Sequence, residues 1–304
     1  MPDRTPPPPA TAGLPRDMSA AVTLSGVEIT EHIAALGHHG ELLADAAAEA
    51  GLATAIPACP GWQVRDLVRH QAYVHGWAAR HVMERPAEVI READEAAVLA
   101  GGPVDDELIG AYRAGLARLV AALGDADAGL RCPAFLPAPS PLAFWARRQA
   151  HETAIHRFDA QSARREGPPD PREAFAPDFA TDGIDELITG FAARPRKDGP
   201  GRTLLVRTVG TPAATPGATG TAVTSVWHYT WPADGQVAAR RLPASATTEA
   251  AGPADGADCV VSGPPSGVYL FLWNRAAMSE TGITVSGDSS VLDAWRSSIR
   301  IRWS

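Results

Sequence analysis

Four segments within the first 164 residues of the 304-residue chain are expected to be helices, three of them with large apolar residues at the 3.6-residue period of an α-helix, and this pattern limits the fold more than any other feature. Prolines and glycines lie between the segments, where they end one helix before the next begins. The expected helices cover residues 27–51, 64–83, 105–123 and 142–164. Four helices joined by connections of moderate length predict an antiparallel four-helix bundle.

The pattern changes after Pro171, where β-branched and alternating runs replace the helical period. The remaining elements are expected as helices over 179–193, 268–277 and 291–299 and as strands over 202–208, 222–230, 258–262 and 282–286. The fold class is therefore predicted as α+β. We expect a disordered Pro-rich tail over residues 1–21, the helical bundle over 22–166, and a smaller α+β domain over 167–304.

Charge and cysteine content argue against several classes of protein. The net charge is −8 and the chain has no Lys/Arg-rich run, which argues against binding to nucleic acid or to a membrane surface. The three cysteines are far apart and lack CxxC spacing, so neither a disulfide framework nor a cysteine-rich zinc site is expected. No apolar stretch approaches the ~20 residues of a membrane span, and no secretory signal is evident. We expect a cytoplasmic protein that acts on small molecules.

The fourth predicted helix carries a carboxylate and an imidazole four residues apart, Glu152 and His156. This spacing places both side chains on one face of the helix, and Arg148 and Asp159 extend the same stripe. Both groups can reach one cation at ~2.0–2.2 Å. The pattern is not the HExxH motif of zinc proteases, because the two histidines here, His151 and His156, are five residues apart.

A third ligand can come from the second predicted helix, where His70 lies on the same stripe as Leu67, Val74 and Trp77. Inward His and Glu side chains from neighbouring helices form metal sites in bundles. Each feature alone has an ordinary explanation, since an inward histidine is usually a hydrogen-bonded core residue and a Glu–His pair at i, i+4 usually stabilises an exposed helix. Their conjunction predicts a site for one divalent cation, zinc first, with nickel, cobalt or iron as alternatives.

Two segments resemble signatures of a known family. Residues 59–70, Cys-Pro-Gly-Trp-Gln-Val-Arg-Asp-Leu-Val-Arg-His, resemble the N-terminal signature of mycothiol-dependent maleylpyruvate isomerases, and residues 148–160, Arg-Gln-Ala-His-Glu-Thr-Ala-Ile-His-Arg-Phe-Asp-Ala, resemble the second. Relatives of that family share a DinB-like metal-binding four-helix bundle. The C-terminal part is similar, around residues 261–275 and 287–288, to the sterol-carrier-protein-like α/β domain of the family, although Asn274 stands where many members have glycine.

This resemblance implies a metal centre and a thiol cofactor. By position, the family's three metal ligands fall on His70, Glu152 and His156, and an arginine thought to reach the active site from the C-terminal domain falls on Arg275. Three protein ligands leave one position open, as in catalytic zinc sites. Mycothiol would fill this position as a thiolate. Zinc, with Arg275 or Arg148, would stabilise the negative charge that develops on the substrate.

The reaction itself is open at this point. The thiolate could add to a cis-enedioate such as maleylpyruvate, permit rotation and leave again, or it could stay attached to an electrophile, as in an S-transferase of detoxification or natural-product tailoring. A non-catalytic metal-containing protein that binds a ligand is the alternative from another class. Either Asp66 or Asp159 could hold the second ring nitrogen of a ligand histidine, and Cys59 is expected to be a packed turn residue. No oligomeric state is predicted.

Overall fold

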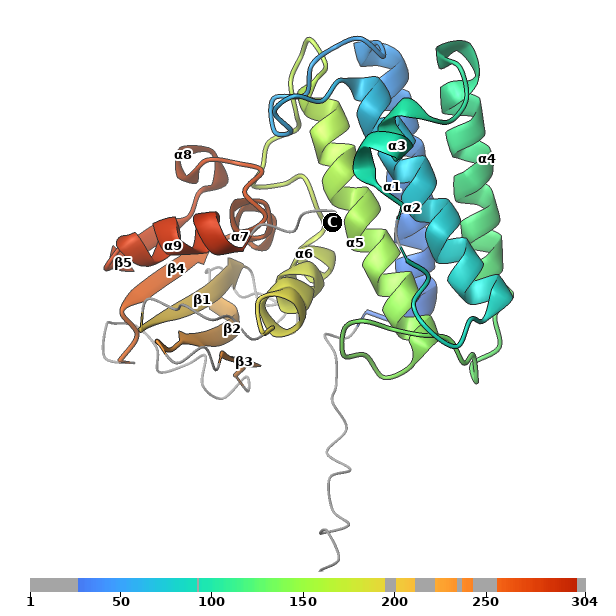
Figure 1. Ribbon diagram of the computed structural model, residues 1–304. Helices are drawn as coiled ribbons and strands as arrows, with labels where there is room; N and C mark the ends of the chain where they lie inside the picture. The colour runs from blue at the N-terminus through green and yellow to red at the C-terminus, as the bar shows by residue number, and fades with distance from the viewer. Residues whose placement is uncertain are drawn as a thin grey trace, which may run out of the picture.

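The computed structural model describes residues 27–91, 93–194, 201–210, 222–233, 237–242 and 256–299, so the tail predicted over residues 1–21 lies outside the described part. The elements in chain order are α1 (Ile29–Ala50), α2 (Val64–Glu84), α3 (Glu95–Ala100), α4 (Asp105–Gly124), α5 (Pro141–Ser162), α6 (Pro177–Asp185), the π-helix η1 (Glu186–Phe191), β1 (Arg202–Gly210), β2 (Ala222–Trp231), β3 (Ala238–Arg241), β4 (Cys259–Gly263), α7 (Pro265–Leu272), α8 (Met278–Thr281), β5 (Thr284–Gly287) and α9 (Ser290–Ser298). The predicted α+β class is confirmed as a mixed fold of helices and one sheet (Figure 1).

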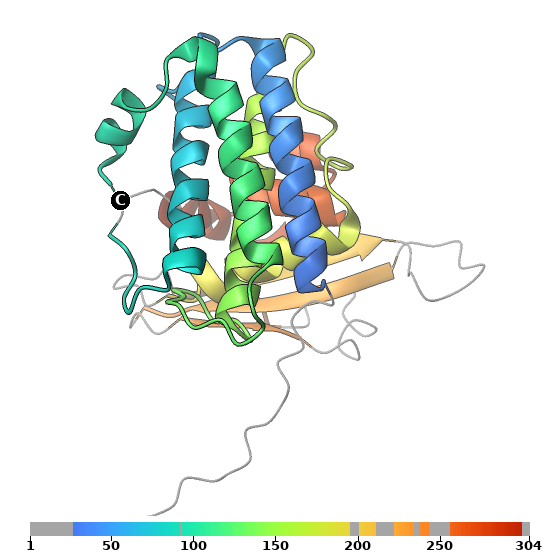
Figure 2. The same ribbon diagram turned by 90° about the vertical axis from the view of Figure 1, so that its right-hand side faces the viewer.

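The long helices α1, α2, α4 and α5 lie side by side (Figure 2). Helix α5 occupies the position between the other long helices and the C-terminal half of the chain (Figure 1). Every residue of α5 from Phe144 to Gln161 is buried except Glu152, which is partly exposed. Helix α5 therefore has no solvated polar face, and its charged side chains must find partners inside the protein.

The start of each ligand-bearing helix is fixed by local capping. Ser140 precedes α5, and its hydroxyl accepts a hydrogen bond from the backbone N–H of Ala143 at 3.1 Å, while Pro141 takes the first helical position. At the start of α2, the carboxylate of Asp66 accepts from the backbone N–H of Gln63 at 2.8 Å in a capping box. These caps satisfy backbone N–H groups at the helix ends and so fix where α2 and α5 begin.

The C-terminal half contains a five-stranded sheet in the order β3-β2-β1-β4-β5. Strand β1 runs antiparallel to β2 and parallel to β4. Side chains of β1 alternate, so Leu204 and Val206 join the main core with the helices, whereas Leu205 belongs to a small second cluster with Val226 and Val260. The main core is continuous from the long helices into this half, which holds the two halves in contact.

Several predicted elements differ from the observed ones. The helix expected over 268–277 is α7, which begins earlier, at Pro265, and ends at Leu272, before Asn274, whose left-handed φ of 58° a helix does not permit. The helix expected over 179–193 is α6 followed by the π-helix η1. The short elements α3, β3 and α8, of 6, 4 and 4 residues, were not predicted, since they are too short to show a period. No helix among the described residues has the length and apolar character needed to cross a membrane.

Candidate metal centre

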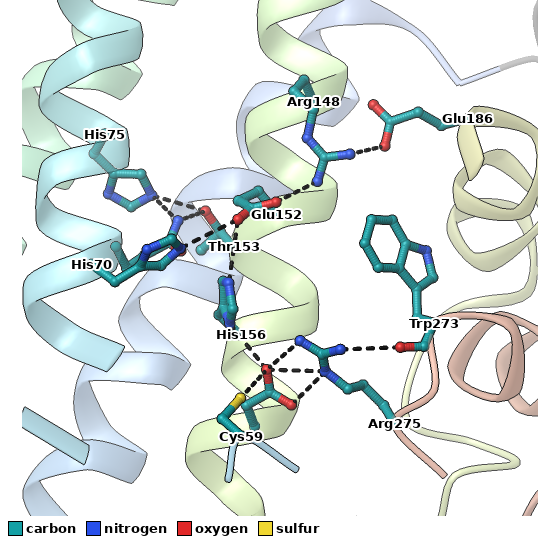
Figure 3. Close-up of polar contacts among 12 residues, drawn as sticks. Cys59, His70, His75, Arg148, Glu152, Thr153, His156, Glu186, Trp273 and Arg275 are labelled. Carbon is teal, nitrogen blue, oxygen red and sulfur yellow. Dashed lines mark hydrogen bonds and ion pairs between the residues drawn. The ribbon is translucent and has the colours of Figure 1, made fainter. Parts of the chain in front are cut away.

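The structure brings the three predicted ligands together at the contact of two helices. Helix α2 supplies His70, and α5 supplies Glu152 and His156. Oxygen Oε1 of Glu152 lies 3.5 Å from Nε2 of His70 and 3.2 Å from Nε2 of His156 (Figure 3). One ligand atom from each residue lies within 4.8 Å of the other two. Ligands that share a tetrahedral cation at ~2.1 Å lie about 3.4 Å apart, so this donor set fits a divalent metal.

Burial and mutual hydrogen bonding control the charges of these groups. Burial alone would raise the pKa of Glu152, but Arg148 and the two imidazoles outweigh it and hold that pKa well below its usual range. For His156, burial opposes the charged form, yet the hydrogen bonds to Asp159 and Glu152 prevail and raise its pKa to about 9. The pKa of His70 is lowered, mainly by burial. The site is thus a partly exposed carboxylate that lies between two imidazole nitrogens.

A second carboxylate orients one of the histidines. Oxygen Oδ2 of Asp159 lies 3.0 Å from Nδ1 of His156, and Asp159 is fully buried. This contact places a proton on Nδ1 and leaves Nε2 directed at Glu152. The sequence offered two acids as the partner of a ligand histidine. Asp159 makes this contact with His156, whereas Asp66 caps α2.

Arg275 reaches the site from the C-terminal half through Asp159. Its Nε and Nη2 donate to the carboxylate of Asp159 at 2.9 and 3.1 Å, and its Nη1 donates to the carbonyl of Trp273 at 3.0 Å. This ion pair holds the pKa of Asp159 below its usual range against the opposing effect of burial. The left-handed turn at Asn274 directs Arg275 back toward α5. Glycine, and after it asparagine, adopts this left-handed backbone conformation most readily.

Arg148, the other arginine expected at the site, is enclosed. Its Nη2 donates to Oε2 of Glu152 at 2.7 Å, and its Nη1 donates to the carboxylate of Glu186 (Figure 3). The rings of Phe191 and Trp273 lie 5.0 and 5.6 Å from its guanidinium carbon. Sequence reasoning missed Glu186, because nothing in a helical pattern separates an acid that pairs across the fold from one that faces water.

Cys59 lies closer to the site than the sequence indicated. Its thiol donates to Oδ2 of Asp159 at 3.6 Å. Burial, together with the neighbouring charge of Asp159, raises the pKa of the thiol to about 12. A thiol with this pKa is almost entirely protonated at neutral pH, which agrees with the prediction of a packed turn residue and not a nucleophile.

A second buried cluster also has the residue types of a metal site, but its carboxylate is already paired with an arginine. Oxygen Oδ2 of Asp182 lies 2.9 Å from Nε2 of His32 and 2.7 Å from Nε2 of His151. The guanidinium of Arg147 donates to the same oxygen at 2.9 Å, and the hydroxyl of Tyr269 lies 3.0 Å from the other nitrogen of His151. A cation there would compete with an arginine for one oxygen that three groups already share. This cluster is best explained as a polar contact that joins α1, α5, α6 and α7.

Comparison with known proteins supports the same family in both halves of the chain. Residues 33–161 match the family model of the mycothiol maleylpyruvate isomerase N-terminal domain, and residues 178–294 match that of the MDMPI C-terminal domain. The first match contains the three candidate ligands, and the second contains Glu186 and Arg275. No curated protein matches the chain.

Two solved structures are similar in fold. A crystal structure of the mycothiol-dependent maleylpyruvate isomerase shows 16% sequence identity and a TM-score of 0.54, covering 87% of this chain and 95% of that chain. A crystal structure of a histidine-to-alanine mutant of that isomerase shows 14% identity and a TM-score of 0.56 with the same coverage. At this level of identity the likeness shows a shared arrangement of elements in both halves.

Proposed function

Because the chain belongs to the mycothiol-dependent maleylpyruvate isomerase family, we propose that it is an isomerase in which His70, Glu152 and His156 hold a divalent cation, zinc, that activates a small thiol. The observation that carries this proposal is the convergence of one carboxylate oxygen and two imidazole nitrogens from two helices. Such a donor set, with three protein ligands, is typical of catalytic zinc sites that keep a position for substrate.

When bound, the cation would keep the thiol of mycothiol deprotonated at neutral pH and so supply a nucleophile for reversible addition to a cis-enedioate such as maleylpyruvate. The protein's own groups prepare the site. Asp159 holds a proton on Nδ1 of His156, so that Nε2 stays available as a ligand. Trp62 packs against His70, with ring centroids 5.2 Å apart, and limits the movement of that imidazole.

For the two arginines we propose a different role from the one expected from the sequence. Both were expected to bind substrate or to stabilise its developing charge. In the structure Arg275 is paired with Asp159, and Arg148 is paired with Glu152 and Glu186. We therefore assign both arginines as positioning residues that fix the groups around the metal.

The finer description of the fold belongs to the same proposal. We infer that α1, α2, α4 and α5 form a DinB-like antiparallel four-helix bundle and that the C-terminal half is a sterol-carrier-protein-like domain, with the boundary near residue 166. The free cysteines among the described residues agree with a reducing compartment, and we place the protein in the cytoplasm with small molecules as partners.

The test is metal analysis of the purified protein joined to a thiol-dependent assay. We expect one zinc per wild-type chain, none in His156→Ala, and full occupancy in His38→Ala, a control histidine exposed on α1. With mycothiol and maleylpyruvate, the wild type should form the trans product with no consumption of thiol. A stable S-conjugate would instead identify an S-transferase, and a protein without metal would leave ligand binding as the better account.

A further inference from the structure

The π-helix that follows α6 is shaped around an arginine of another helix. At its end, the backbone N–H of Ala192, the residue after η1, donates to the carbonyl of Leu187 at 2.8 Å, five residues back. Residues five apart in an α-helix differ in direction by about 140°, whereas the wider π-turn brings them toward one face. Glu186 and Phe191, the first and last residues of η1, both contact the guanidinium of Arg148.

The guanidinium of Arg148 makes hydrogen bonds to two carboxylates, and two aromatic rings lie near it. One guanidinium nitrogen donates to Glu186 and the other to Glu152. Only 4% of the side chain is exposed, and the rings of Phe191 and Trp273 lie against it. A planar guanidinium with two carboxylate partners and aromatic neighbours has little freedom to rotate.

The two oxygens of Glu152 consequently have different environments. Oxygen Oε1 faces the Nε2 atoms of His70 and His156, at 3.5 and 3.2 Å. Oxygen Oε2 accepts the hydrogen bond of Arg148 at 2.7 Å and points away from the imidazoles (Figure 3). Only one oxygen of this carboxylate is therefore directed at the point that the three candidate ligands share.

We propose that Arg148, fixed in place by Glu186, restricts Glu152 to a single ligand oxygen and so keeps coordination positions open for the thiol and the substrate. This inference rests on the proposed metal function. A carboxylate can bind a cation through one oxygen or through both, and the second oxygen would occupy a position needed for chemistry. Glu186 is a positioning residue, because it shares the charge of Arg148 and prevents that arginine from drawing Glu152 away from the cation.

The first variant is Glu186→Gln, which keeps the shape of the side chain and removes its charge. Arg148 would then interact with Glu152 alone and compete more strongly for its oxygens. We expect zinc affinity, measured by competition with a chromogenic chelator, to fall by about 10- to 100-fold, as second-layer changes in metal sites typically do. The control is Glu173→Gln, an exposed acid in the loop before α6, which should leave the affinity unchanged.

The second variant, Arg148→Met with Glu186→Gln, removes both members of the pair and leaves no uncompensated buried charge between them. Both oxygens of Glu152 are then available to the cation. We expect the visible absorption bands of the cobalt-substituted protein to lose intensity, because cobalt with more ligands absorbs more weakly than tetrahedral cobalt. Circular dichroism and thermal unfolding of each variant establish that it is folded.

The outcomes separate this inference from the function on which it rests. If the wild-type protein takes up neither zinc nor cobalt, the proposed metal site is wrong. If the wild type binds both metals, and the zinc affinity of Glu186→Gln and the cobalt spectrum of the double variant both equal those of the wild type, then the metal site stands and the role of Arg148 and Glu186 is refuted.

Discussion

Asp159 is the residue on which most parts of the candidate site depend. It accepts hydrogen bonds from His156 on its own helix, from Cys59 in the loop before α2, and from Arg275 in the C-terminal half. Removing a buried carboxylate that accepts from several donors leaves those donors without their acceptor, which costs free energy. At the residue scale, the orientation of His156 therefore depends on a group that is not itself a ligand.

The first prediction concerns Asp159→Asn, which keeps the shape and removes the charge. An amide oxygen can accept from His156 or Arg275 but carries no charge to balance the guanidinium, and its contact with His156 is weaker than that of a carboxylate, so His156 is held less firmly. We expect zinc affinity to fall by about 10- to 100-fold in a chelator competition assay. Asp66→Asn is the matched control, since that acid only caps α2, and equal affinities in the two variants would contradict the prediction.

The second prediction concerns Cys59. Because its pKa is raised to about 12, Cys59 contributes almost no thiolate at neutral pH, and Cys59→Ser should keep both metal content and turnover. The rate of alkylation of Cys59 by iodoacetamide should continue to rise with pH toward about 12, whereas the rate for an ordinary thiol is half-maximal at its pKa of ~8.5 and levels off above it. Loss of turnover in the serine variant would show that Cys59 takes part in the reaction.

At the scale of elements, the turn after α7 decides whether Arg275 can reach Asp159. Helix α7 ends at Leu272, and Asn274 then takes a φ of 58°, which reverses the chain before Arg275. The side chain of Asn274 is exposed and makes one long hydrogen bond, in which its amide donates to the carbonyl of Ile299 at 3.4 Å, so the larger part of its role lies in its backbone conformation. This explains how asparagine can stand where glycine is common in the family.

The third prediction follows from this backbone requirement. Asn274→Gly should leave the free energy of unfolding and the zinc content nearly unchanged, because glycine adopts the left-handed conformation without strain. Asn274→Val should lower the free energy of unfolding by about 1–2 kcal/mol, the cost of a left-handed conformation for such a residue. Urea unfolding of both variants provides the measurement, and an equal loss in the two would show that the asparagine side chain itself is needed.

Sequence reasoning succeeded where a single element carries the signal. The long helices α1, α2 and α4 have apolar periods that extend over about six turns each, and the pair Glu152 and His156 of α5 follows from helix geometry alone. It failed where the signal depends on another part of the fold. The end of α7 depends on one residue's φ, and Glu186 gains its importance from an arginine 38 positions earlier in the chain.

At the scale of the whole molecule, the two halves meet through buried charges as well as apolar packing. Arg147 of α5 donates to Asp182 and Asp185 of α6, and His32 of α1 and His151 of α5 contact the same carboxylate of Asp182. Ligand-bearing helix α5 is thus fixed to the C-terminal half along most of its length, by this cluster near its start and by the pair of Asp159 and Arg275 near its end.

The fourth prediction concerns the pH dependence that this cluster gives the whole protein. Burial would raise the pKa of Asp182, but the hydrogen bonds from His151 and His32 and the charge of Arg147 hold that pKa far below its ordinary value. A carboxyl whose pKa is depressed in the folded state stabilises that state above its unfolded pKa, and this contribution is lost as the pH falls toward the folded pKa. Asp182→Asn removes this stabilising contribution and leaves the buried positive charge of Arg147 with less negative charge to balance it.

We expect Asp182→Asn to lower the free energy of urea unfolding by about 3–5 kcal/mol at pH 7, the usual cost of breaking a buried ion pair. The difference between wild type and variant should narrow below about pH 4, where the unfolded wild-type carboxyl takes up a proton that the folded one does not. Asp178→Asn, an exposed acid in the first turn of α6, is the control and should change stability little at any pH. A difference that stays constant from pH 7 to pH 3 would mean that packing at Asp182, and not its charge, joins the two halves.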